Sequence, residues 1–102
     1  MIEITIKHDA VKIHGHANYD QYGKDIVCAG ISALGQTLLL SLEELTEDDY
    51  SALCSDGELC IKFRTLSDGA KILKGSFLIG CKAIAECYPD NVRLSTSNYY
   101  RQ

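Results

Sequence analysis

The chain has 102 residues, of which 46% are hydrophobic and 24% charged, and these values are typical of one folded domain spanning residues 1–102. A net charge of −4 argues against direct binding to nucleic acid, because nucleic-acid binders present a basic face. We find no window with the roughly 18 apolar residues of a membrane span, so we expect no membrane partner.

The first 17 residues alternate polar and apolar side chains at the period of a strand. Every second residue from Ile2 to Ile6 is apolar, which predicts a half-buried strand over residues 1–7. Residues 10–17 predict a second strand, and the short connection between the two makes them a hairpin. Because the strand pattern begins at Met1 without a basic or apolar leader, we expect a cytoplasmic protein.

Two histidines lie on the polar face of the second predicted strand. Alternation puts His14 and His16 on the same side, so periodicity does not select between them. Gly15 lies between them, and a glycine inside a strand often marks a bend. A bend at Gly15 would turn His16 toward the segment that follows.

A polar loop over residues 18–24 carries Tyr19 and Tyr22 and ends at Gly23. Loops that join rigid elements often carry binding residues, and tyrosine serves both in binding and in packing. The two tyrosines therefore either contact an extended substrate or cover the edge of the sheet. We expect this loop to be mobile, with Gly23 as a hinge, and to close over a substrate.

Asp25 is the predicted N-cap of a helix over residues 26–45. An apolar stripe follows helical spacing: Val27, Ile31, Leu34, Leu38, Leu42 and Leu45. A second apolar line lies nearly opposite and consists of Ala29, Ala33 and Leu40. A helix that is apolar on two sides is buried on two sides, so we expect a homodimer, with the 18–24 loop as the alternative cover.

Cys28 falls in the first turn of this helix, at the border of the apolar stripe and one turn above Ser32. Unpaired backbone N–H groups and the positive end of the helix dipole favour a thiolate there, and we expect those N–H groups to form an oxyanion site. If the loop brings His16 close, the two residues form a Cys/His pair for acyl transfer. The alternative is a cysteine that fills space.

The remaining residues predict a second hairpin, a second helix and a last strand. An acidic connection over residues 43–49 is expected to be solvated. The turn Asp56-Gly57 joins strands over residues 50–55 and 58–64. A helix follows from Ser67 to about Tyr88, then a strand over residues 92–96 and a frayed tail. The order ββαββαβ predicts an α+β fold, a two-layer sandwich with a mixed sheet and both helices on one face.

The other four cysteines have no spacing typical of a zinc site or of a disulfide within one element. They are Cys54, Cys60, Cys81 and Cys87. We expect them to be reduced and to act as small apolar fillers, and we expect neither a metal nor a cofactor.

The segment from residue 15 to residue 32 resembles the signature of the ribosomal-processing cysteine protease family, Prp, which consists of small bacterial proteins. The matching residues are Gly15, His16, Ala17, Gly23, Asp25, Ile26, Val27, Cys28, Ala29 and Ser32. One departure is Gly30, where a bulkier small residue such as alanine is expected. The resemblance implies a cysteine-protease domain that removes the N-terminal extension of a large-subunit ribosomal protein.

On this resemblance Cys28 is the nucleophile and His16 is the general base. Gly15, Asp25 and Ser32 support them, and Tyr19, Tyr22 and Gly23 belong to the substrate loop. The sequence does not identify a third catalytic group. Two alternatives stay open: a dimeric, non-enzymatic adaptor that binds a ribosomal protein, and a redox-sensing thiol protein. The adaptor predicts no fast alkylation of Cys28, whereas the sensor predicts fast alkylation without cleavage.

Overall fold

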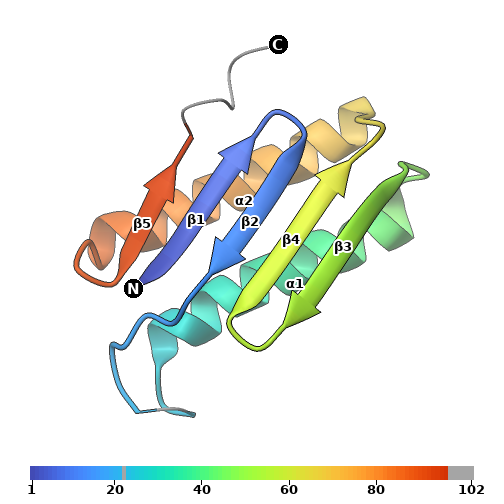
Figure 1. Ribbon diagram of the computed structural model, residues 1–102. Coiled ribbons are helices and arrows are strands. Elements are labelled where there is room, and N and C mark those ends of the chain that lie inside the picture. Colours follow the sequence, from blue (N-terminus) through green and yellow to red (C-terminus); the bar gives the residue numbers. More distant parts are fainter. Residues whose placement is uncertain (22, 97–102) are drawn as a thin grey trace.

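Five strands form a mixed sheet, and two helices cover one of its faces, in the computed structural model, which describes residues 1–21 and 23–96 (Figure 1). The elements are β1 (Ile2–Lys7), β2 (Ala10–His14), α1 (Ile26–Leu45), β3 (Tyr50–Ser55), β4 (Glu58–Phe63), α2 (Asp68–Cys87) and β5 (Val92–Ser95). The strand order is β3-β4-β2-β1-β5, and β1 and β5 pair in parallel. The predicted two-layer α+β fold is therefore confirmed.

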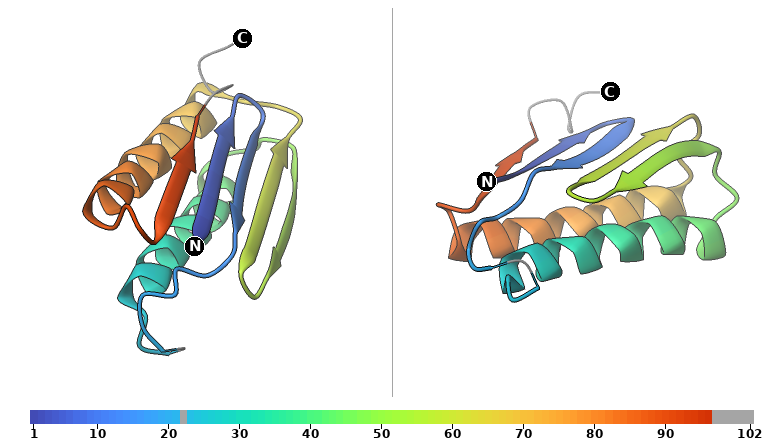
Figure 2. Two further views of the ribbon diagram at one scale, coloured as in Figure 1. Left: turned by 60° about the vertical axis from the view of Figure 1, so that its left-hand side comes forward. Right: turned by 60° about the horizontal axis from the view of Figure 1, so that its bottom comes forward.

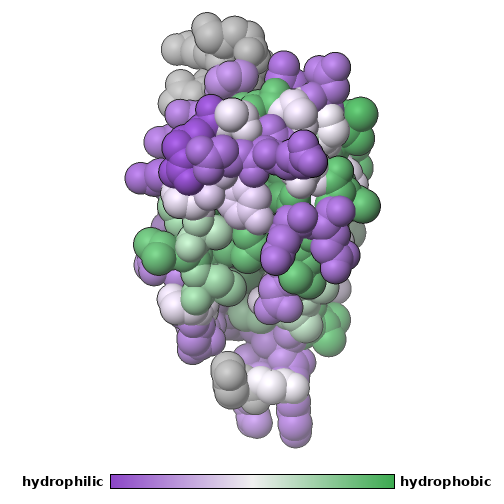
Figure 3. Space-filling view, turned by 90° about the vertical axis from the view of Figure 1, so that its right-hand side faces the viewer, coloured by the Kyte–Doolittle hydropathy of each residue, from purple (hydrophilic) through white to green (hydrophobic). Residues whose placement is uncertain are grey.

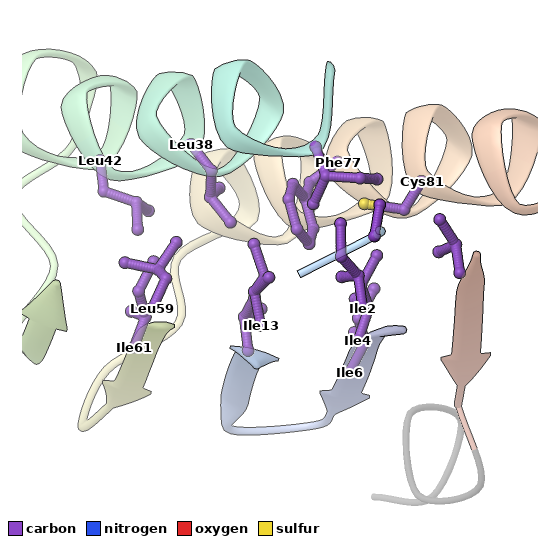
Figure 4. Close-up of a cluster of buried hydrophobic side chains, with 14 of the residues drawn as sticks. Ile2, Ile4, Ile6, Ile13, Leu38, Leu42, Leu59, Ile61, Phe77 and Cys81 are labelled. Carbon is purple, nitrogen blue, oxygen red and sulfur yellow. The ribbon is translucent and has the colours of Figure 1, made fainter. Parts of the chain in front are cut away.

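The core lies between the sheet and the two helices, which run side by side beneath it (Figure 2). The alternation of β1 buries Ile2, Ile4 and Ile6 almost completely against the helix layer. Side chains from β2, β4, α1 and α2 complete the same cluster: Ile13, Leu59, Ile61, Leu38, Leu42, Phe77 and Cys81 (Figure 4). The predicted hydrophobic faces of the strands and of both helices thus meet in one core.

The second strand is shorter than its sequence pattern predicts. It ends at His14, three residues before the predicted end, because Gly15 has a left-handed backbone with φ +98°. A Cβ atom at Gly15 would lie 2.5 Å from the carbonyl oxygen of Met1, so a larger residue does not fit. The chain leaves the sheet at this glycine and enters the loop before α1. The predicted tail, residues 97–102, lies outside the described residues.

The acidic segment predicted as a solvated connection over residues 43–49 is largely exposed, but its first three residues belong to α1 and the rest is a hydrogen-bonded corner. Asp48 accepts hydrogen bonds from the backbone N–H of Ser67 (2.8 Å) and from the Thr65 hydroxyl (2.9 Å). Asp49 makes a two-pronged pair with the Arg64 guanidinium, with both contacts at 2.8 Å. The side chains of Asp48 and Asp49 therefore fix the end of β4 and the start of α2. The acidic composition of the segment alone does not predict this role.

All five cysteines are free thiols. Cys81 is fully buried among core side chains, and this burial raises the pKa of its thiol to about 12. Cys54 and Cys87 are exposed, and Cys60 is partly buried. The expectation of apolar fillers is therefore right for Cys81 and wrong for Cys54 and Cys87, whose strand edge and helix end are open to solvent.

Helix α1 has the length and hydropathy of a membrane span, with a mean hydropathy of 1.6 over its most apolar window. The expectation that no such window exists is therefore wrong. Val27, Ile31 and Leu42 of this helix are buried against the sheet. The fold thus uses one side of this apolar helix for its own core, and 28% of the window is buried.

Lys74 is the one buried charged residue among the described residues, with 3% of its surface exposed. Its Nζ donates a hydrogen bond to the Lys7 carbonyl oxygen at 2.7 Å and lies 5.4 Å from the centre of the Phe63 ring. Burial lowers the pKa of Lys74 to about 8, and nearby Asp9 partly opposes the shift. The lysine therefore links α2 to the β1–β2 turn at an electrostatic cost near neutral pH.

This cost predicts a specific pH dependence of stability. Between about pH 8 and pH 10.5 the unfolded lysine still binds a proton that the folded lysine has lost, so stability rises with pH. Relative to Lys74→Met, the free energy of unfolding of the wild type should rise by up to about 1.4 kcal/mol per pH unit in this interval. Urea unfolding of both proteins at several pH values measures the difference. A difference that stays flat or falls contradicts the account.

Candidate active site

The loop before α1, the first half of α1 and the β3–β4 turn lie at one end of the sheet (Figure 1). Residues of all three line a cavity of about 590 Å³. Six of the predicted site residues line it: Gly15, His16, Gly23, Asp25, Cys28 and Ser32. His14 does not line it. The bend at Gly15 thus separates the two histidines that periodicity left equivalent, and it directs His16 into the cavity that contains Cys28.

Asp25 caps α1, as predicted, and it also holds the preceding loop. Its Oδ1 accepts hydrogen bonds from the backbone N–H groups of Val27 (3.0 Å) and Cys28 (2.9 Å), and its Oδ2 accepts one from Tyr19 (2.9 Å). Partial burial acts to raise the pKa of Asp25, but these backbone hydrogen bonds together outweigh it, and the pKa lies below its ordinary value. The N–H groups of Val27 and Cys28 are therefore engaged, and the expectation that they form an oxyanion site is wrong.

The thiol of Cys28 is held by the residue that follows His16. The backbone N–H of Ala17 donates a hydrogen bond to Cys28 Sγ at 3.2 Å. Ala17 is itself buried, and its carbonyl oxygen accepts a hydrogen bond from Asn91 Nδ2 at 3.0 Å. Sequence reasoning missed Ala17 and Asn91 as site residues, because a backbone donor carries no side-chain signal and Asn91 lies 74 residues away.

The two histidines have different partners. His14 Nδ1 lies 2.8 Å from Glu58 Oε1, its neighbour across the β2–β4 pair. His16 Nε2 lies 4.0 Å from Asp56 Oδ2, and the His16 side chain is 48% exposed. Within the described residues no hydrogen bond joins His16 to Cys28. The two residues line the same cavity.

The first half of the loop is anchored. The Tyr19 ring packs edge to face on Tyr88, with ring centres 5.2 Å apart, and its backbone is bound by Asp25. For Tyr19 this favours the structural interpretation over substrate contact. Gly23 has φ +86° and no neighbour within 4 Å of a Cβ position, and its role as a hinge stays a prediction. Tyr22 lies outside the described residues, and mobility of the loop stays a prediction.

Gly30, the departure from the expected motif, has a packing reason. A Cβ atom at this position would lie 3.2 Å from Cδ1 of Ile84, so the glycine allows α1 and α2 to approach closely. It lies outside the cavity lining. The glycine at this position therefore contributes to the packing of the two helices.

Comparison with known proteins identifies the family. The sequence pattern described as "Cysteine protease Prp" matches residues 1–93. The chain belongs to the Prp family of cysteine proteases. A Staphylococcus aureus relative named "Ribosomal processing cysteine protease Prp" is 31% identical over 101 residues, covering 92% of this chain and 95% of the relative. A Mycoplasma genitalium relative of the same name is 26% identical and covers 97% of this chain and 99% of its own length.

Solved structures agree with this assignment. The crystal structure of an essential ribosomal processing protease Prp from S. aureus, in complex with a covalently linked product peptide, superposes with a TM-score of 0.84. Its sequence is 30% identical, and the match covers 94% of this chain and 97% of that one. The protein SMU.848 from Streptococcus mutans superposes with a TM-score of 0.79 at 30% identity, covering 94% of this chain and 93% of that one. The Prp fold is thus shown along with the family, and the protein is a cysteine protease.

Because Asp25 both caps α1 and binds the preceding loop, its removal should destabilise the helix and the loop together. Asp25→Ala should lower the free energy of unfolding by about 1–2 kcal/mol, as the loss of a helix cap does. The amides of Tyr19 and Asp20, which both face Asp25 Oδ2, should then exchange hydrogen faster. Chemical denaturation and hydrogen exchange measure the two effects.

Asp90→Ala, which removes an exposed aspartate outside any cap, is the matched control and should change neither quantity. Unchanged loop exchange in Asp25→Ala would show that the loop has another anchor.

The stability that Asp25 provides also depends on pH. Since the folded state favours the Asp25 carboxylate, its contribution to the free energy of unfolding is complete above pH ~4 and is lost as pH falls through the lowered pKa.

Proposed function

We propose that the protein cleaves the N-terminal extension of a large-subunit ribosomal protein through a covalent intermediate on Cys28. One observation carries the proposal: in a chain of this protease family, the only predicted Cys/His pair lines a single cavity beside the start of α1. The names of the relatives supply the substrate class. A second S. aureus Prp structure, at 27% identity and a TM-score of 0.74, contains a substrate peptide.

The residues divide the reaction between them. Cys28 Sγ attacks the scissile carbonyl carbon, and His16 takes the thiol proton and gives it to the leaving amine. Water then hydrolyses the thioester, with His16 as the base. Ala17, whose N–H points at Sγ, is placed to stabilise the negative charge that develops on sulfur. His16 must come within about 3 Å of its proton donor, so the imidazole moves toward Cys28 when substrate binds.

The charge of the protein suits such a substrate. The net charge is −4, and the cavity lining includes Asp20, Asp56 and Glu58. A cleft with carboxylates at its rim attracts a positively charged segment and increases the rate of encounter.

We propose that the enzyme acts in the cytoplasm, where five free thiols persist, without a cofactor. The partly buried, cavity-facing position of Cys28 favours the protease over an adaptor with an inert thiol.

The first test is removal of the nucleophile. Cys28→Ala should abolish cleavage of a synthetic peptide that reproduces the N-terminal extension of a large-subunit ribosomal protein from the source organism. Loss of one partly buried thiol should cost far less than the ~2–5 kcal/mol of a large core truncation, so the variant should fold. Cys87→Ala, which removes an exposed thiol on α2, is the matched control and should keep full activity. Mass spectrometry of the products reads out cleavage, and an active Cys28→Ala variant refutes the proposal.

We also propose that the protein is a homodimer. The second apolar line of α1 is uncovered in the single chain: Ala29 and Ala33 are exposed, and Leu40 is 56% exposed. The alternative cover, the 18–24 loop, packs on Tyr88 at its first half. In Figure 3 the helix layer lies at the right, and apolar side chains reach the surface there among polar ones.

Light scattering tests this proposal. At micromolar concentration the wild type should have twice the 11.2 kDa mass of one chain, and Leu40→Glu should have the mass of a monomer, because the charge would be buried in the interface. Leu53→Glu changes a leucine on β3 that is 77% exposed and should remain dimeric. A wild-type monomer, or a dimer that survives Leu40→Glu, contradicts the proposed interface.

A further inference from the structure

The β3–β4 turn lies against the proposed general base. Strands β2 and β4 are antiparallel and end with His14 opposite Glu58. The ladder continues one step further, because the backbone N–H of Gly15 donates to the carbonyl oxygen of Gly57 at 2.8 Å. The next residue in this register, His16, therefore comes opposite Asp56. The turn that joins β3 to β4 is fixed beside the imidazole by the sheet itself.

Gly57 provides the surface on which the imidazole rests. It has φ +71°, as a tight hairpin turn requires. A Cβ atom there would lie 2.7 Å from His16 Nε2 and 3.1 Å from Cε1. No side chain larger than hydrogen fits between turn and ring in this arrangement. Two features therefore favour glycine at position 57: the positive φ of the turn and the close approach of the His16 ring.

Asp56 is the carboxylate that faces the ring. Its Oδ2 lies 4.0 Å from His16 Nε2. The other carboxylates at the cavity have different partners: Asp25 accepts backbone N–H groups of the loop and of α1, and Glu58 is paired with His14. Asp20 accepts a hydrogen bond from the backbone N–H of Gln21 at 2.7 Å. Asp56 is therefore the carboxylate available to orient His16.

We propose that the Asp56-Gly57 turn positions His16 for proton transfer, an inference that rests on the proposed role of His16 as general base. The Asp56 carboxylate accepts the Nε2–H proton in a hydrogen bond, which leaves Nδ1 as the basic nitrogen. The proton of Cys28 Sγ–H moves to Nδ1, which yields a thiolate and an imidazolium, and Asp56 stays ionised and stabilises the imidazolium. The 4.0 Å separation shortens by about 1 Å in the complex, since catalytic hydrogen bonds are often long in a free enzyme.

The test compares kcat and KM of purified variants on the same extension peptide. Asp56→Asn should lower kcat about tenfold with KM within twofold of the wild type, and Asp56→Glu should recover at least half of the loss on a logarithmic scale. Gly57→Ala should lower kcat further, because its methyl group displaces the ring. Glu3→Gln is the matched control: it removes a carboxylate from an exposed pair with Arg93, and it should keep wild-type kcat. Circular dichroism checks that each variant is folded, as the exposure of Asp56 leads us to expect.

The outcomes separate this inference from the function on which it rests. An active His16→Gln variant would mean that the proposed general base is wrong. An inactive His16→Gln together with an Asp56→Asn variant of unchanged kcat overturns the positioning role alone. A change confined to KM in Asp56→Asn also overturns it, because it would assign Asp56 to substrate binding. If Asp56→Asn lowers kcat and Asp56→Glu lowers it equally, the positioning role is also overturned, because the longer carboxylate would still accept the hydrogen bond from His16.

Discussion

The arrangement of the site depends on the Asp25 carboxylate, which accepts hydrogen bonds from backbone N–H groups of the loop before it and of the helix after it. One oxygen caps the helix that carries Cys28, and the other holds the loop at Tyr19. A buried helix end without such a partner would leave N–H groups unsatisfied, at a cost of about 1–3 kcal/mol each. Because the loop is held from one end by Asp25 and from the other by the sheet, Ala17 is brought against the sulfur, and His16 enters the same cavity.

A second constraint acts at Gly15. The carbonyl oxygen of Met1 leaves no room for a side chain there, so the chain turns out of the sheet at this residue. The result is that one of two similar histidines faces the cavity and the other pairs with Glu58. Catalytic geometry in this protein thus follows from where a strand stops. A backbone hydrogen bond joins the β3–β4 turn to Gly15, and the Asp56 carboxylate of this turn lies beside His16.

Sequence reasoning succeeds here where signals are periodic or local. The alternation of β1, the apolar stripe of α1 and the Asp25 cap each depend on neighbouring residues. The alternation and the cap are confirmed, and the stripe is confirmed from Val27 to Leu42. Its last predicted member, Leu45, is 72% exposed, because the helix end extends past the edge of the core. It fails where the deciding partner is distant in the chain: the length of β2 depends on Met1, and the acidic corner at Asp48 depends on Ser67. The oxyanion expectation fails for a different reason, since its deciding partner is local: the Asp25 cap satisfies the N–H groups of Val27 and Cys28 that an oxyanion site would need. Asp56 had a clear signal as a turn residue, but its approach to His16 depends on the β2–β4 register.

Covalent labelling decides whether Cys28 Sγ is the atom that attacks the substrate. A chloromethyl ketone built on the residues that precede the cleavage site would alkylate the nucleophile that the bound peptide meets. We expect one label per chain, on Cys28, with loss of cleavage in proportion to labelling, even though Cys54 lines the same cavity and is more exposed. Complete inhibition with the label on Cys54 or on any other residue, found by peptide mapping, would contradict it.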